Sequence, residues 1–217
     1  DSYEFFGGTV DTKYMIAYGG IDDDFDTDNG YSGRNQFLLG KRFRQVADQS
    51  TSQTFESDND ASGSRNEPLT RAVYSNVTAI GAVADTSWTP GSGDNNQYNR
   101  LFGSAAMIRR NSRISILNSV FAGFPAAVEF GGPNPGFSAD AASRDSLQLR
   151  NNTYIGIKAN WRNAVPAGTT SFAANWLTDA ANGNTIINQS GSLDNYDGLT
   201  NVFVEGTNQF NPVPKMD

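Results

Sequence analysis

The fold is decided by residues 21–40, which read IDDDFDTDNGYSGRNQFLLG. Five aspartates fall within the seven positions 22–28, and a glycine-containing turn separates them from the apolar run 36–39 and Gly40. This order of acidic loop, glycine, short strand and glycine is typical of one unit of a repeating β structure. The stretch therefore predicts further copies elsewhere in the chain.

Further copies are present as β-rich runs that end in glycine, most of them with an asparagine five residues before it: Asn35, Asn76, Asn118 and Asn151, with Tyr14 in this place before Gly19. The glycines at positions 19, 40, 81, 123 and 156 follow at intervals of 21, 41, 42 and 33 residues. A period of about 20 residues, or its double, is typical of a β-solenoid. We therefore predict an all-β parallel solenoid with asparagines stacked at one bend. The alternative is a β-sandwich whose strands end in glycine-containing turns.

The chain indicates one domain over 1–217, with clear coils in 1–157 and an irregular region in 158–217. Loops are predicted at 82–100 and 130–142, one short helix at 171–181, and a last strand with an extended tail at 201–214. Because the chain begins in mid-pattern, we expect it to be part of a longer solenoid.

Composition favours folded β structure and excludes several functions. The chain has 22 glycines, but its 14 Phe, 8 Tyr and 3 Trp argue against disorder. It contains neither Cys nor His, which excludes disulfides, thiolate metal sites and a Ser-His-Asp triad. The net charge of −7 disfavours a nucleic-acid partner, and no apolar run approaches a membrane-spanning length.

The acidic loop predicts a cation site that extends over neighbouring coils. Asp1–Glu4 precedes Asp23–Asp26 by 22 residues with a matching aromatic and matching acidic ends, and a third acidic cluster follows at 56–60. Carboxylates this dense repel one another unless a cation, a proton or an arginine compensates them. The predicted ligands of Ca²⁺ are Asp22, Asp23, Asp24, Asp26, Asp28, Glu56, Asp58 and Asp60. The alternative is a solvated loop paired with Arg34, Arg42 or Arg65.

The loop is not an EF-hand, although alternate carboxylates at 24, 26 and 28 resemble one. An EF-hand requires glycine at its sixth position and glutamate at its twelfth, where this chain has Asn29 and Asn35. Calcium is still the ion that we predict here, because Ca²⁺ takes six to eight oxygen ligands and this loop is rich in them.

An ordered set of motifs resembles a family of surface proteins. It comprises residues 1–40, ESDNDASGS at 56–64, RAVYSNVT at 71–78, IRRN at 108–111 and LNS at 117–119. Together they are similar to uncharacterised secreted or lipid-anchored proteins of Bacteroidetes-type bacteria. The resemblance implies a right-handed parallel β-helix and an extracellular or cell-surface location at the outer membrane of a Gram-negative bacterium. It implies no activity.

Three hypotheses for function follow. The first is a non-catalytic, calcium-stabilised β-helix module that is structural or presents a glycan or a surface-protein partner. The second is a β-helical polysaccharide lyase, in which Arg109, Arg110 or Arg113 would act as the base beside Ca²⁺; the simpler role of these arginines is to neutralise the acidic clusters. The third is a subunit of an outer-membrane or extracellular assembly, joined through exposed strand edges. The tryptophans at 88, 161 and 176 are assigned to packing rather than to sugar stacking.

Overall fold

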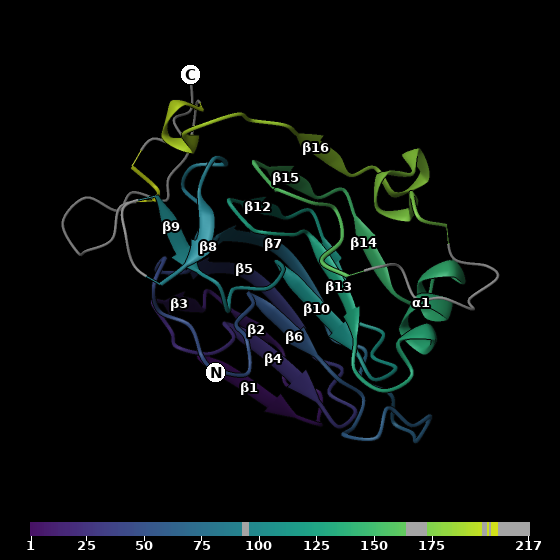
Figure 1. Ribbon diagram of the computed structural model, residues 1–217. Helices are drawn as coiled ribbons and strands as arrows, with labels where there is room; N and C mark the ends of the chain where they lie inside the picture. Colours follow the sequence, from purple (N-terminus) through teal and green to yellow (C-terminus); the bar gives the residue numbers. More distant parts are fainter. Residues whose placement is uncertain (93–95, 164–172, 197–198, 200, 204–217) are drawn as a thin grey trace.

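Short strands alternate along the chain between two parallel sheets (Figure 1). This computed structural model describes residues 1–92, 96–163, 173–196, 199 and 201–203. The first sheet, sheet A, has the strand order β1 (Tyr3–Phe6), β4 (Phe25–Asp28), β6 (Phe55–Ser57), β10 (Ala106–Arg109) and β13 (Val128–Gly131). Tyr3 pairs with Phe25 and Glu4 pairs with Asp26, which confirms the 22-residue offset between the first two acidic segments.

The second sheet, sheet B, contains nine strands within the described part of the chain. They are β2 (Thr12–Lys13), β3 (Ile16–Tyr18), β5 (Arg34–Lys41), β7 (Val73–Ile80), β11 (Ser115–Leu117), β12 (Val120–Ala122), β14 (Gln148–Arg150), β15 (Thr153–Ile155) and β16 (Thr185–Ile187). The pairs within both sheets are parallel, unlike those of an antiparallel β-sandwich. A separate pair, β8 (Thr89–Gly91) and β9 (Gln97–Asn99), lies in the region predicted to be a loop.

One strand of sheet A and the sheet B strands that follow it form a layer, and five such layers begin at β1, β4, β6, β10 and β13. Buried residues alternate with partly exposed ones along β4, as the period of two requires. Aromatic rings pack against one another in the interior: the centroids of Phe25 and Phe55, in neighbouring layers, are 5.5 Å apart, and the rings of Phe55 and Tyr74, in the same layer, meet edge-on with centroids 4.8 Å apart. These buried rings form the core on which the outer faces are built.

A bend between the two halves of sheet B carries a column of residues with left-handed backbone. The asparagines of this column are Asn76 (φ 56°), Asn118 (φ 51°) and Asn151 (φ 54°). Asparagine tolerates this conformation better than most residues. Tyr14 and Phe37 occupy the same position in the first two layers, and their rings stack at 5.4 Å. The predicted stack of asparagines is therefore present in three layers.

Asn35 does not belong to this column of residues, so its predicted place in the asparagine stack was wrong. It pairs with Tyr74 rather than Asn76, two residues out of step. Its buried amide oxygen accepts hydrogen bonds from Tyr31 Oη at 2.9 Å and Thr12 Oγ1 at 2.6 Å. Gly40 is out of step by the same two residues, since it pairs with Ala79 and not with Gly81.

The α-helix lies elsewhere than predicted. Helix α1 (Pro135–Ser143) occupies the segment predicted to be a glycine- and proline-containing loop and packs beside β13 (Figure 1). Proline at the start of a helix is favourable, because its missing N–H would have no partner there. Within 171–181, the described part forms the short 3₁₀ turns Trp176–Thr178 and Ala180–Asn182 instead. Most of the strand and tail predicted at 201–214 lies outside the described residues, and β16 continues sheet B beyond residue 157.

Candidate cation site

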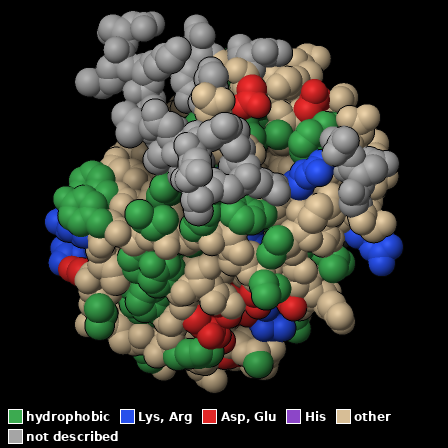
Figure 2. Space-filling model, turned by 90° about the vertical axis from the view of Figure 1, so that its left-hand side faces the viewer, with side chains coloured by type: hydrophobic (Ala, Val, Ile, Leu, Met, Phe, Trp, Pro, Cys, Tyr) green, Lys and Arg blue, Asp and Glu red, His purple; other side chains and the backbone are tan. Residues whose placement is uncertain are grey.

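The predicted acidic clusters meet on the outer face of sheet A. In-register pairing aligns Glu4, Asp26 and Glu56 on neighbouring strands. Asp28, the last residue of β4, and Asp58, directly after β6, follow two residues further along the chain. Figure 2 shows acidic side chains gathered low on the face that it presents, next to basic ones. Residues distant in sequence thus form one acidic surface because parallel strands repeat in register.

Two groups of carboxylates are close enough to share one ion. Oxygens of Asp1, Asp22 and Asp23 lie within 4.8 Å of one another, as do oxygens of Asp1, Glu4 and Asp26. The Oδ1 atom of Asp26 is buried and has no hydrogen-bond partner among the described residues. Carboxylate oxygens are the donors that Ca²⁺ prefers, so this donor set fits a hard cation.

The pKa values of these carboxyls reflect their crowding. Burial, followed by the charges of Glu56 and Asp22, raises the pKa of Asp23 to about 9, although Gln53 N–H donates to it. Burial, Glu56 and Asp58 raise the pKa of Asp26 to about 8. Burial raises the pKa of Glu56 to about 7 despite the opposing charge of Arg109. At neutral pH the cluster therefore holds protons that a cation would displace.

Five of the eight predicted ligands lie outside both groups: Asp24, Asp28, Glu56, Asp58 and Asp60. Asp24 is fully buried and pairs with Arg42, whose Nη1 lies 2.6 Å from Asp24 Oδ1. Asp60 accepts hydrogen bonds from Ser62 and Ser64 in its own turn, and these bonds lower its pKa. Neither residue belongs to the carboxylate groups described above. The sequence prediction included them because spacing along the chain does not reveal which way a carboxylate points.

The arginines at 109 and 110 neutralise the far end of the acidic surface. Arg109 pairs with Glu56 and with Asp58, and Arg110 Nη1 lies 2.7 Å from Asp58 Oδ2. Burial lowers the pKa of Arg109, but the hydrogen bond and charge of Asp58 outweigh it and raise that pKa overall. A lyase base must give up its proton, so this environment argues against Arg109 in that role. The neutralising role predicted for these arginines is confirmed, except for Arg113.

The sequence prediction omitted Asp1 and Glu4 from the ligand set. Both residues fall in the carboxylate groups around Asp22, Asp23 and Asp26. The signal was available, because the 22-residue offset places Glu4 beside Asp26. Arg34 and Arg65, suggested as partners of the acidic loop, are placed differently: Arg34 pairs with Asp11 at 2.6 Å, and Arg65 lies over the Phe137 ring.

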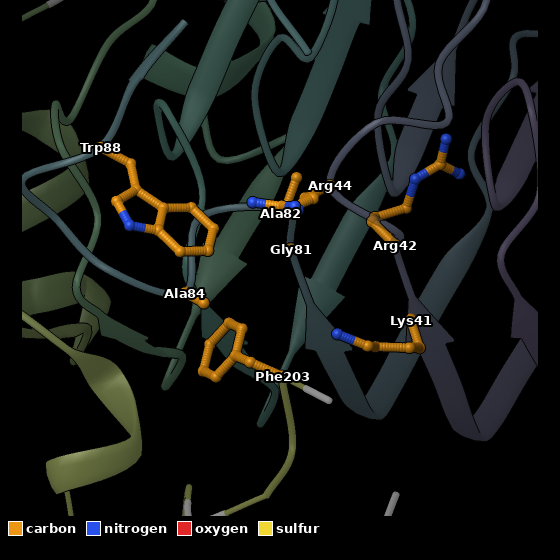
Figure 3. Close-up of a pocket in the computed structure, with 8 residues that line it drawn as sticks. All are labelled: Lys41, Arg42, Arg44, Gly81, Ala82, Ala84, Trp88 and Phe203. Atoms are coloured by element: carbon orange, nitrogen blue, oxygen red, sulfur yellow. The ribbon is translucent and has the colours of Figure 1, made fainter. Parts of the chain in front are cut away.

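A separate cavity of about 280 Å³ lies at the end of β5 (Figure 3). The Nζ of Lys41 lies 5.3 Å from the Phe203 ring centroid, and the Arg44 guanidinium carbon lies 5.5 Å from that of Trp88. Arg42 also lines the cavity, but its guanidinium points away from the other side chains drawn (Figure 3), and its Nη1 donates a hydrogen bond to Asp24 Oδ1. Trp88 therefore packs against the guanidinium of Arg44, while Trp161 and Trp176 pack around Phe130.

The sheets are parallel, and outward side chains of paired strands are aligned in register. These two features define a class of all-β protein that is built from stacked strands. Residues 1–193 match the family model described as pectate-lyase like beta helix domain. The chain belongs to this family, and a parallel β-helix is the fold that the family implies. No curated protein and no solved structure gives a match.

Domains of this family are commonly extracellular, and a carbohydrate-related extracellular module fits the match. Within the part of the chain that the structure describes, no helix is long and apolar enough to cross a membrane.

Proposed function

We propose that the chain is a right-handed parallel β-helix module of a bacterial surface protein, non-catalytic and stabilised by Ca²⁺, which presents a glycan or a protein partner. The observation that carries the calcium role is the group of Asp1, Glu4 and Asp26, with one buried Asp26 oxygen left without a hydrogen-bond partner among the described residues. Glu4 and Asp26 stand on neighbouring strands, so an ion between them would tie the first two layers together.

Calcium is expected to raise the melting temperature by roughly 5–10 °C at a concentration about 100 times its Kd, because it binds the native state and not the unfolded chain. Thermal unfolding at neutral pH with Ca²⁺ and with a chelator measures this shift. In Asp26→Asn the shift should disappear, since the central ligand is lost. Asp145→Asn, which changes an exposed carboxylate paired with Arg150 in another layer, should keep it. Equal melting temperatures of the wild-type protein with calcium and with chelator would contradict the proposed stabilisation by calcium.

The second candidate function is an assembly subunit, because apolar surface gathers on the first two layers. The large hydrophobic side chains exposed among the described residues all fall within positions 6–37; Phe6 is 63% exposed, Tyr14 72% and Ile16 59%. The inward rings of Tyr3 and Phe5 are half-buried, whereas Phe25 in the next layer is fully buried. Among the described strands, β1 pairs with β4 alone, and β2 and β3 pair with β5 alone.

We propose that a second copy of the chain covers this end by adding strands to β1, β2 and β3. Sedimentation velocity should then show concentration-dependent self-association of the wild-type protein. Ile16→Lys, which places a charge on β3, should leave a monomer, while Gln49→Lys in the exposed loop after β5 should associate like the wild type. A wild-type protein that stays monomeric at every concentration would contradict this candidate.

A further inference from the structure

A cavity of about 200 Å³ lies between helix α1 and the bend that joins β10 to β11. It is outside the acidic surface described above. Its lining residues are Arg65, Asn111, Arg113, Phe137, Asp140, Ala141, Arg144 and Ser146. Three separate segments thus bring arginines to one small hollow: the loop after β6, the bend before β11 and the end of α1.

The positive charge of this cavity is poorly compensated. None of Arg65, Arg113 and Arg144 makes an ion pair with any described carboxylate, in contrast to Arg109 and Arg110. Arg113 Nε is buried with no described hydrogen-bond partner, and Arg113 Nη1 reaches Ser146 Oγ at a long 3.4 Å. Among the described residues that line the cavity, Asp140 is the one that is acidic.

The pKa of Arg113 reflects this excess of positive charge. Burial lowers its pKa, and the charges of Arg71, Arg65 and Arg144 lower it further, against the opposing charge of Glu67. Like charges held together around a hollow disfavour the folded state unless an anion lies between them. A bound anion would also give the buried Arg113 Nε an acceptor.

We propose that this cavity binds a dianionic tetrahedral oxyanion: inorganic phosphate, or the phosphate monoester end of a larger molecule. Three arginines and Asp140 leave a net charge of about +2, which a dianion neutralises. Arginine presents several N–H donors in a planar fork that matches such oxygens. The hollow is smaller than the roughly 300–1,000 Å³ of pockets that hold a whole ligand, so it accommodates one anionic group.

Isothermal titration calorimetry at fixed ionic strength tests this proposal, with inorganic phosphate and a hexose 6-phosphate as probes and acetate as the monoanionic comparison. We expect saturable binding of phosphate with a Kd on the order of 1 mM or tighter, and at least about tenfold weaker binding in Arg65→Gln and in Arg144→Gln. Both side chains are exposed, so neither variant should disturb folding. Hexose phosphate binding more tightly than phosphate identifies an ester as the source; phosphate binding alone identifies the free anion.

Arg100→Gln is the matched control, because Arg100 is an exposed arginine that does not line the cavity. It should bind phosphate like the wild type. The proposal is overturned if neither probe binds, if acetate binds as tightly as phosphate, or if the affinity is the same in Arg65→Gln, Arg144→Gln and the wild type. Circular dichroism of each variant confirms that a loss of binding is not a loss of fold.

Discussion

Arg42→Met is expected to lower the free energy of unfolding by about 3–5 kcal/mol, or roughly 10 °C in melting temperature. The Arg42 and Asp24 side chains have no exposed surface, and their charged atoms lie 2.6 Å apart. The guanidinium also lies over the Phe102 ring at 5.5 Å. Removing the arginine leaves a carboxylate buried without its counter-charge, which costs far more than a lost surface contact. Chemical denaturation of the folded variant measures the loss.

Two further variants make this prediction specific to burial. Arg34→Met removes a pair of similar length, Arg34 to Asp11, but one whose side chains are 76% and 47% exposed, so its effect on stability should be small beside that of Arg42→Met. The double variant Asp24→Leu with Arg42→Met should recover most of the loss, because neither charge then remains buried. Equal effects of Arg34→Met and Arg42→Met would contradict the argument.

The Arg42→Met penalty should also depend on pH. Burial already raises the pKa of Asp24 to about 6 with Arg42 present. Without the arginine, Asp24 can stay buried only as the neutral acid. The variant should therefore be closer to the wild type near pH 5 than near pH 8.

In the absence of divalent cations, the free energy of unfolding should fall as the pH rises from about 5 to about 9. Asp23, Asp26 and Glu56 keep their protons in the folded chain up to pKa values of about 9, 8 and 7. In the unfolded chain such carboxyls lose their protons near pH 4. Between these limits the native state binds more protons than the unfolded state, so each rise in pH favours unfolding.

The loss across this range should reach at least about 2 kcal/mol, or roughly 5 °C. Melting temperatures measured in chelator at several pH values test it. Asp26→Asn should flatten the profile, because a neutral side chain removes one of the three groups. Added Ca²⁺ should flatten it too, since the ion replaces the protons. A stability that increases with pH over the same range would contradict the picture of crowded, buried carboxyls.

The repeat and the acidic offset were readable in sequence because parallel strands stack in register. The spacing of 22 residues between Glu4 and Asp26 becomes a strand pair. Asparagine at the left-handed bend was also predictable for Asn76, Asn118 and Asn151, since few other residues accept that conformation. The strand register of Asn35 was not predictable, because an apolar strand aligns almost equally well after a shift of two residues.

The sequence by itself thus determined parallel stacked strands, an acidic surface across the first three layers, and its neutralisation by Arg109 and Arg110. The tertiary structure alone decided which carboxylates face outward. Asp24 points inward to Arg42 and Asp60 stays in its own turn, while Glu4 joins the outer column. The tertiary structure alone also places Arg65, Arg113 and Arg144, which come from three separate segments, around one cavity. The reason is physical: spacing fixes which residues share a column, whereas side-chain direction and long-range contacts depend on how the loops between strands fold back.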